Sequence, residues 1–206
     1  MQSSNRGGDS EGVELQAPSS CFSPLPQGIV NESQPVTVIL KEKIWSLSGD
    51  SFKILDTNQR EVLQIKGKVF SFRQQKVLCD SNGHELGLIL KKLLTFKPQE
   101  DIYTPDRSKK IASVSRKSLF QLKSNAVVQV LTTGEQINIS GSFLARNFTF
   151  QLGDQTIAHV HRSLFNSRNL LAGKDSYLLT VAPNVDLAFM VLVTVCLDEI
   201  FNDKND

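Results

Sequence analysis

The stretch VDLAFMVLVTVCLDEIF, residues Val185–Phe201, decides the fold of this chain. Its central residues, Leu187–Leu197, are apolar apart from Thr194, and no helical spacing leaves a polar face. A helix that is apolar on every side must be surrounded by protein or by lipid. We therefore expect the preceding chain to form a wall around it. The expected core positions of this helix are Leu187, Phe189, Met190, Leu192, Val193 and Cys196.

Local signals favour a helix that does not cross a membrane. Met, Leu and Ala are good helix formers, and Pro183 and Asn184 supply a start signal with Asn184 as the predicted N-cap. A bilayer needs about 20 apolar residues, more than this run provides. The flanking residues Asp186 and Asp198 are acidic rather than basic. The alternative is a buried β-strand, because the run contains several β-branched valines, but its length and start signal favour the helix.

Composition indicates the class of protein. The chain has 206 residues and a net charge of +2, so bulk electrostatics gives no reason to expect nucleic acid as a partner. Its cysteines, Cys21, Cys79 and Cys196, are irregularly spaced and form no CxxC pair. This pattern predicts a reducing compartment and no disulfide framework. Because no apolar signal segment opens the sequence, we expect a cytoplasmic, monomeric protein.

The chain divides into two parts. Residues 1–34 are rich in Ser, Gly, Pro, Gln and Asn, and such a segment buries too little apolar surface to offset the entropy of ordering. We therefore expect a disordered N-terminal tail over 1–34 and a single domain over 35–206.

Short apolar runs separated by turn signals fill the domain up to the helix. Turns are expected at Asp56-Thr57-Asn58, Asp80-Ser81-Asn82-Gly83 and Gly153-Asp154. Many short strands at regular spacing predict a sandwich or a barrel, and a barrel of more than about 8 strands must enclose something. The expected strands are Val36–Leu40, Phe52–Asp56, Val62–Ile65, Val69–Phe72, Lys76–Cys79, Glu85–Lys91, Ile102–Thr104, Ile111–Ser115, Leu119–Lys123, Val127–Thr132, Gln136–Ser140, Leu144–Leu152, Thr156–His161 and Ser176–Val181.

Three segments of the chain resemble the LURP-one-related family. They are TVILKEKIWSLSGDSFKILDTNQREVLQIKGK, VLCDSNGHELGLILKKLL and YLLTVAPNVDLAFMVLVTVCLDEI. The similarity covers roughly Pro35–Phe201, and its most specific parts are the W-S-x-S-G-D turn and the V-A-P-N-V-D…C-L-D-E ending. The resemblance implies a mainly β (α+β), tubby-like fold: a closed antiparallel barrel of about twelve strands around a central hydrophobic C-terminal helix.

The resemblance implies less about activity. The family has no agreed biochemical activity, and some members are linked to defence. Tubby relatives bind phosphoinositides, and phospholipid scramblases are thought to share the fold. Because a fold does not settle function, these properties serve as analogies.

Two kinds of chemistry receive weak support from the residues. His159 and His161 share a strand face, but zinc needs three or four ligands, and only His84, Cys79 or Asp154 are conceivable partners. A repeat of Ile111–Arg116 at Ile157–Arg162 places serines at the positions of both histidines, which favours a polar outer face. We therefore expect no metal site and no cofactor. No G-x-S-x-G or activated cysteine appears, so we expect no catalytic residues.

A concentration of basic residues is the remaining candidate site. Lys and Arg outnumber acids between Lys91 and Lys123, and such side chains hold phosphate groups by charge-assisted hydrogen bonds. Ordinary solvated strand faces are the alternative explanation. Nucleic acid is less favoured because no aromatic residues alternate with the charges. The expected lipid-headgroup site comprises Lys91, Lys92, Lys109, Lys110, Arg116 and Lys117.

The sequence therefore predicts a non-enzymatic, tubby-like binding module, cytoplasmic or peripheral to membranes, that recognises phosphoinositide or other anionic headgroups in defence or signalling. A protein-interaction scaffold without lipid affinity is the alternative, and an uncharacterised enzyme is the second alternative.

Overall fold

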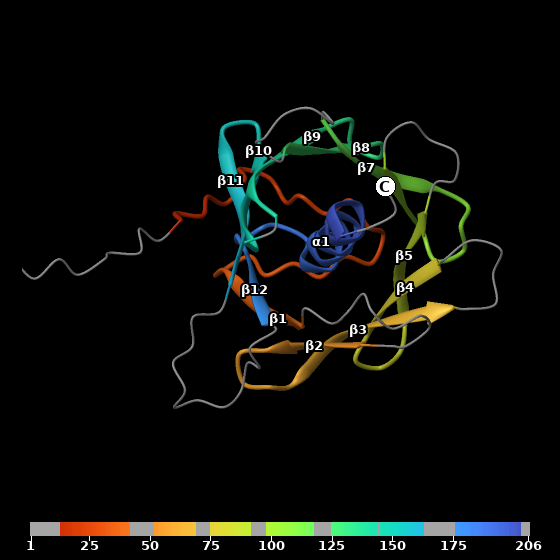
Figure 1. Cartoon of the computed structure of the whole chain (residues 1–206). Coiled ribbons are helices and arrows are strands. Elements are labelled where there is room, and N and C mark those ends of the chain that lie inside the picture. The colour runs from red at the N-terminus through yellow and green to blue at the C-terminus, as the bar shows by residue number, and fades with distance from the viewer. Residues whose placement is uncertain are drawn as a thin grey trace, which may run out of the picture.

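The computed structural model describes residues 13–41, 52–68, 75–91, 98–117, 125–143, 145–162 and 176–202. Within these residues, twelve antiparallel strands close into a barrel around one helix, α1 (Leu187–Asn202), which occupies the centre of the ring (Figure 1). The strands are β1 (Val36–Lys41), β2 (Phe52–Asp56), β3 (Glu61–Lys68), β4 (Gln75–Asp80), β5 (Glu85–Lys91), β6 (Gln99–Tyr103), β7 (Lys110–Arg116), β8 (Asn125–Val130), β9 (Gln136–Ser142), β10 (Asn147–Leu152), β11 (Gln155–Arg162) and β12 (Ser176–Val181).

The barrel is a simple meander. Each strand pairs with its neighbours in sequence, and β1 closes the ring by pairing with β12, with Val36 opposite Val181 and Lys41 opposite Ser176. The side chains alternate across the wall, as β8 illustrates: Ala126, Val128 and Val130 are fully buried, whereas Gln129 is exposed. This alternation gives the apolar inner surface that a closed sheet needs. The predicted closed antiparallel barrel around a central C-terminal helix is confirmed.

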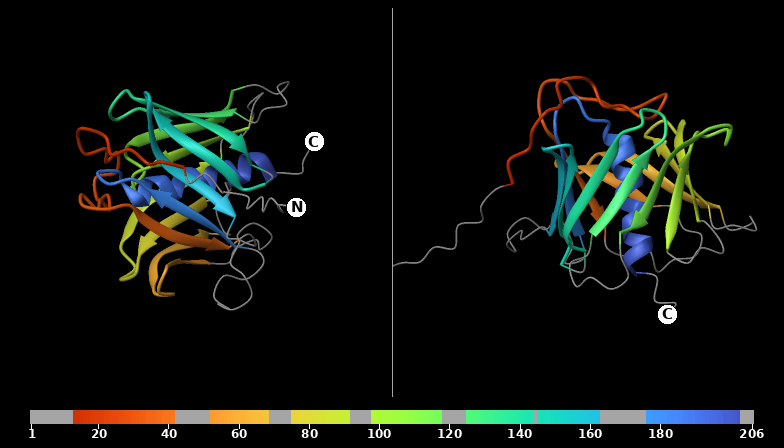
Figure 2. Two further views of the ribbon diagram at one scale, coloured as in Figure 1. Left: turned by 90° about the vertical axis from the view of Figure 1, so that its left-hand side faces the viewer. Right: turned by 90° about the horizontal axis from the view of Figure 1, so that it is seen from above.

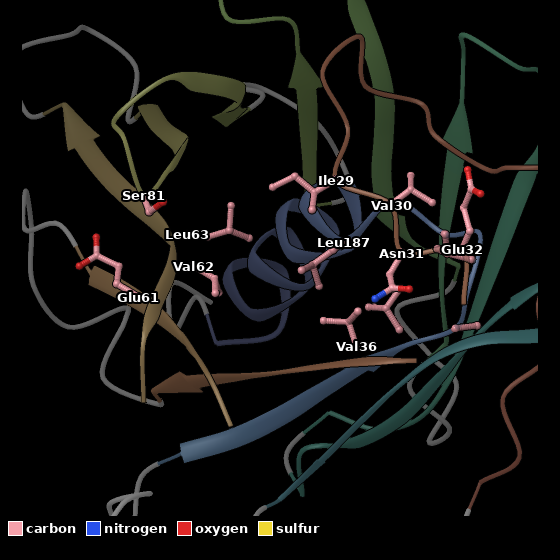
Figure 3. A pocket seen from close by; sticks show the side chains of 13 residues that line it. Ile29, Val30, Asn31, Glu32, Val36, Glu61, Val62, Leu63, Ser81 and Leu187 are labelled. Carbon is pink, nitrogen blue, oxygen red and sulfur yellow. The ribbon is translucent and has the colours of Figure 1, made fainter. Parts of the chain in front are cut away.

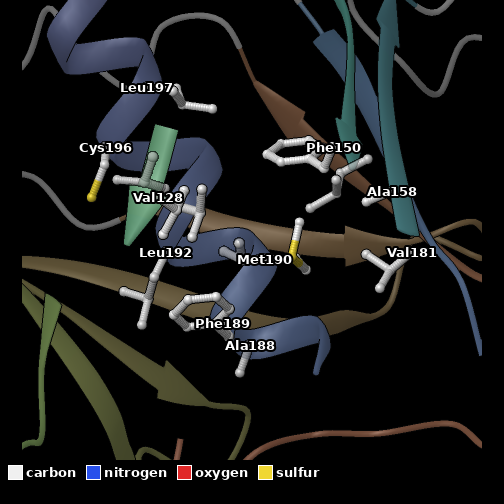
Figure 4. Close-up of a cluster of buried hydrophobic side chains, with 14 of the residues drawn as sticks. Val128, Phe150, Ala158, Val181, Ala188, Phe189, Met190, Leu192, Cys196 and Leu197 are labelled. Carbon is white, nitrogen blue, oxygen red and sulfur yellow. The ribbon is translucent and has the colours of Figure 1, made fainter. Parts of the chain in front are cut away.

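The helix is buried over almost its entire length. The six core residues predicted in α1 are all buried, and Phe189 and Val193 have no exposed surface. Thr194, the polar interruption in the apolar run, donates its hydroxyl to the Met190 carbonyl 2.8 Å away, so this hydroxyl is paired inside the core. Side chains from the wall surround the helix on several sides (Figure 4). The labelled wall residues are Val128, Phe150, Ala158 and Val181.

The helix begins two residues later than its predicted cap implies. Asn184 lies in a turn with φ 62°, and Asp186 is the N-cap. The Asp186 carboxylate accepts a hydrogen bond from the Phe189 amide at 3.2 Å, and its carbonyl accepts from the Met190 amide at 3.0 Å. Asp186 therefore satisfies one of the amides that a helix start leaves unpaired, that of Phe189, and its carbonyl accepts the first hydrogen bond within the helix.

Residues 13–34, the N-terminal segment, are docked on the barrel, whereas the sequence predicted a disordered tail. It crosses the end of the barrel at which α1 begins (Figure 2), and Phe22 and Leu25 are each only 3% exposed. Phe22 packs edge-on against Phe189, with 6.0 Å between ring centroids. Two anchored apolar side chains thus hold a segment whose average composition is polar.

Backbone hydrogen bonds fix the same segment to the turn before α1. The Phe22 amide donates to the Asn184 carbonyl at 2.7 Å, and the Asp186 amide donates to the Phe22 carbonyl at 2.9 Å. The Leu187 amide donates to the Ile29 carbonyl at 2.7 Å. The Asp186 carboxylate adds bonds from the Ile29 amide and the Ser23 hydroxyl. Segment and helix cap therefore form one hydrogen-bonded unit.

Several predicted strand limits are confirmed and others change. Phe52–Asp56, Glu85–Lys91 and Ser176–Val181 match the structure. The strand predicted from Leu144 begins at Asn147 instead, because Arg146 takes a left-handed φ of 52° in the turn that precedes it. The strands predicted at 69–72 and 119–123, and the W-S-x-S-G-D turn, lie outside the described residues.

Deleting residues 1–33 should lower the melting temperature, because it removes Phe22 and Leu25 from the core. A net loss of about 2 kcal/mol would correspond to a shift of about 4–8 °C for a chain of this size. Deleting residues 1–12 removes no contact that the structure describes and is the matched control. Differential scanning calorimetry of both variants measures the effect, and equal melting temperatures would show that the segment is not docked.

Replacing Asp186 with Ala should reduce the free energy of unfolding by about 2 kcal/mol or more, because a helix cap is lost and buried donors are left unpaired. Ser23→Ala removes one of the same bonds and should cost about 1 kcal/mol. Urea denaturation measures both values. A loss smaller for Asp186→Ala than for Ser23→Ala would contradict the role given to this carboxylate.

Candidate functional site

The predicted basic site is divided between the two ends of the barrel. Lys110 is the first residue of β7 and Arg116 the last, so their backbones are separated by about 20 Å at the usual strand rise. Lys109 and Lys110 therefore lie at the end where α1 begins, and Arg116 and Lys117 lie at the other. Lys91 lies at the same end of the barrel as Arg116. It is the last residue of β5 and pairs with Glu100 near the start of β6, and the start of β6 pairs with the end of β7. Lys92 lies outside the described residues.

The charge of Lys110 is neutralised locally. Its ammonium lies 2.7 Å from the carboxylate of Asp101, which is only 6% exposed. The same carboxylate accepts hydrogen bonds at 2.9 Å from the Ser113 hydroxyl and from the Gln99 amide. Lys110 thus compensates the charge of the buried Asp101 carboxylate, and it contributes little attraction for an anion in solution.

Arginine and aromatic side chains meet at the end where α1 finishes. The guanidinium of Arg116 lies 4.4 Å from the centroid of the Phe201 ring. The same ring also stacks on Phe143, with 3.8 Å between the ring centroids and 7° between the planes. Lys117 donates to the Asn138 side-chain oxygen at 2.6 Å, and no acidic side chain among the described residues forms an ion pair with it.

Two further cations at this end bind acids of the helix. Arg146 forms an ion pair with Asp198, and Lys76 forms one with Glu199. Burial lowers the pKa of Lys76 to about 8, although Glu100 and Asp198 act in the opposite direction. These two pairs secure the last turn of α1 to β4 and to the turn before β10.

A cavity of about 620 Å³ lies at the opposite end, between the N-terminal segment and the rim of the barrel (Figure 3). Its lining is mostly aliphatic, with a few polar groups. Prediction from sequence missed it, because one wall was assigned to the disordered tail. The lining residues are Ile29, Val30, Asn31, Glu32, Val36, Glu61, Val62, Leu63, Ser81, Val181, Ala182, Val185 and Leu187.

The two histidines of β11 lie together, but the other conceivable ligands lie elsewhere. The rings of His159 and His161 stack at 5.1 Å, and His159 contacts the Asn147 side-chain oxygen at 3.0 Å. Burial lowers the pKa of both. His84 instead pairs with Asp80 in the β4–β5 turn. Within the described ranges, no three His, Cys, Asp or Glu side chains are grouped as metal ligands would be.

Neither buried thiol is arranged as a nucleophile. Burial raises the pKa of Cys79, and it raises that of Cys196 well above the ordinary value. Both therefore remain protonated at neutral pH, whereas a reactive cysteine requires thiolate character.

Comparison with known proteins gives consistent results. The family model described as LURP-one-related matches residues 36–198. Protein LURP-one-related 15 of Arabidopsis thaliana is 26% identical over 197 residues, which cover 89% of this chain and 90% of that protein. The uncharacterized protein YxjI of Bacillus subtilis is 26% identical over 172 residues, covering 83% of this chain and 98% of that protein.

A solved structure of an Arabidopsis thaliana protein shares the fold. It superposes with a TM-score of 0.62 at 22% identity, over 85% of this chain and 99% of that one. Among the described residues, no helix combines the length and the apolar character needed to cross a membrane.

The titration of Lys76 gives a pH-dependent prediction. The folded protein releases this proton near pH 8, whereas the unfolded chain holds it to about 10.5. The unfolded state therefore binds more protons in this window, and the stability contributed by Lys76 rises with pH from about 8 to 10.5. The test compares the free energy of unfolding of the unaltered protein with that of Lys76→Met. The difference, unaltered minus variant, should increase by about 1 kcal/mol or more between pH 8 and pH 10.5.

Urea denaturation at several pH values between 7 and 10 tests this prediction. Lys53→Met is the control for removing one lysine from an ion pair, because Lys53 binds Glu61 on the surface with 65% of its side chain exposed. A difference that stays flat or falls for Lys76→Met would contradict the assigned direction.

Proposed function

Because the chain belongs to the LURP-one-related family, we propose that it is a non-enzymatic binding module, cytoplasmic or peripheral to membranes, that recognises anionic lipid headgroups. The site is the pair Arg116 and Lys117 at the end of the barrel where α1 finishes. This proposal keeps part of the basic cluster predicted from the sequence and excludes the pair Lys109 and Lys110 at the other end.

The geometry of Arg116 is the observation that carries the proposal. Its guanidinium stacks on Phe201, and no acidic side chain pairs with it among the described residues. Stacking on an aromatic ring holds the planar group in place and leaves its N–H edge available. A guanidinium in this arrangement can bind a phosphate through two parallel hydrogen bonds.

Neighbouring charges support the same assignment. Lys117 is adjacent in sequence and keeps its charge, because its partner is the neutral Asn138. The cations Lys76 and Arg146 are compensated by Glu199 and Asp198. Of these four cations, Arg116 and Lys117 are therefore the two that can attract an anion.

Vesicle sedimentation tests the proposal with two matched double variants. Arg116→Gln with Lys117→Gln should weaken binding to phosphatidylcholine vesicles containing a phosphoinositide by about 30-fold, at about 1 kcal/mol per basic residue near an anionic surface. Lys109→Gln with Lys110→Gln removes the same charge from the opposite end and should bind within a factor of about three of the unaltered protein.

Salt dependence and melting temperature complete the experiment. Retention of the unaltered protein should fall between 50 and 300 mM salt, since surface electrostatics is screened, and both variants should melt as folded proteins. Equal loss in the two variants, or salt-insensitive binding, would reject this site. No retention of the unaltered protein would favour the protein-interaction scaffold.

A further inference from the structure

The cavity at the other end of the barrel has the features of a separate ligand site. Its volume of about 620 Å³ falls within the range of about 300–1,000 Å³ that is usual for small-molecule sites. Such sites are mostly apolar with a few polar groups, and the aliphatic lining with Asn31, Ser81 and two glutamates fits that description. We propose that this cavity binds a small apolar molecule that carries a neutral or cationic polar group.

The charge of the lining selects against anions. Among the described residues that line it, the charged ones are Glu32 and Glu61, and none is a Lys, Arg or His. Lys53 pairs with Glu61 at 2.6 Å, but 65% of the lysine side chain is exposed to solvent, so screening leaves that pair weak. A carboxylate or phosphate would be repelled, whereas an ammonium or a hydrogen-bond donor would find acceptors at the rim. The cavity therefore differs in chemistry from the Arg116 end.

The wall supplied by the N-terminal segment is held in place without a ligand. The Ile29 amide donates to the Asp186 carboxylate at 3.0 Å, and the Asn184 amide donates to the Asn31 carbonyl at 2.9 Å. Leu187, which also lines the cavity, donates its amide to the Ile29 carbonyl. Because these bonds hold the wall in place before binding, a ligand does not have to order the segment. The entropy cost of that ordering is therefore not subtracted from the binding free energy.

The side chains of the lining suggest where the ligand would lie. Glu61 and Ser81 stand at one side of the cavity and Glu32 at the other, with Val62, Leu63 and Leu187 between them (Figure 3). An apolar body would cover the aliphatic centre, and its polar group would reach a glutamate at either side. This arrangement predicts a preference for a cation over an anion on the same hydrocarbon chain.

Fluorescence titration with the neutral dye Nile red, on the full chain, tests the site. We expect saturable binding of one dye per protein. Val62→Trp fills the cavity centre and should weaken the dye at least tenfold. Ser81→Trp blocks the cavity from an exposed turn and should act in the same direction even if Val62→Trp fails to fold. Leu131→Trp, at a residue 51% exposed that does not line the cavity, is the matched control and should bind as the unaltered protein does.

Competition between two probes of equal chain length tests the charge preference. Decylamine should displace the dye at a concentration at least tenfold below that of decanoate, and Glu32→Gln with Glu61→Gln should reduce this ratio. Absence of saturable binding, equal binding by Ser81→Trp and Leu131→Trp, or preference for decanoate would each overturn the proposal. These measurements contain no vesicles, so their outcome is independent of the headgroup site at Arg116.

Discussion

A helix without a polar face is the constraint on which the rest of this structure depends. Side chains on every side of α1 lose their contact with water only if the sheet closes completely, and β1 pairs with β12 to close it. An open sheet would expose part of the helix and would also leave unpaired strand edges. The large apolar area buried on both the helix and the inner wall then stabilises the two together. Neither the helix nor the inner wall would bury its apolar surface without the other.

Each end of the buried helix has unpaired backbone groups and a partial charge that need polar partners. Different parts of the chain supply these partners at the two ends. At the start, Asp186 places a negative charge where the helix dipole favours one and accepts bonds from the N-terminal segment. At the finish, Asp198 and Glu199 oppose the dipole, and no basic residue lies in the last turn. Arg146 and Lys76 from the wall supply the missing cations. These ion pairs fix the helix along the barrel axis as well as compensating the acids.

The sequence predicts the elements well because their signals are local. The apolar run, the turn residues and the alternation along strands such as Phe52–Asp56 all act within a few residues of one another. The docked segment was missed because composition is an average, whereas docking depends on two particular side chains, Phe22 and Leu25. A pair of large apolar residues between prolines was the available signal. The cap was missed because Asn184 and Asp186 are equally good cap residues and only the backbone distinguishes them.

The candidate site shows the same limit more sharply. Lys110 and Arg116 are close in sequence, yet the strand predicted between them already implied opposite ends of the sheet. A count of charges along the chain does not show that the two residues lie at opposite ends of the strand. It also does not show which acid pairs with each cation, such as Asp101 with Lys110. Partners and cavities arise from residues far apart in sequence, which no local pattern encodes.

The N-terminal segment connects the cavity to the stability of the helix. The hydrogen bonds that hold Ile29 in the cavity wall end on Asp186 and Leu187, the cap and first residue of α1. A molecule that binds only when the wall is docked therefore stabilises the docked segment by mass action. The same hydrogen bonds then stabilise the start of α1, because the N-terminal segment undocks from Asp186 and Leu187 less often. A ligand in the proposed cavity and the start of α1 are thus thermodynamically linked through the hydrogen bonds of Ile29 to Asp186 and Leu187.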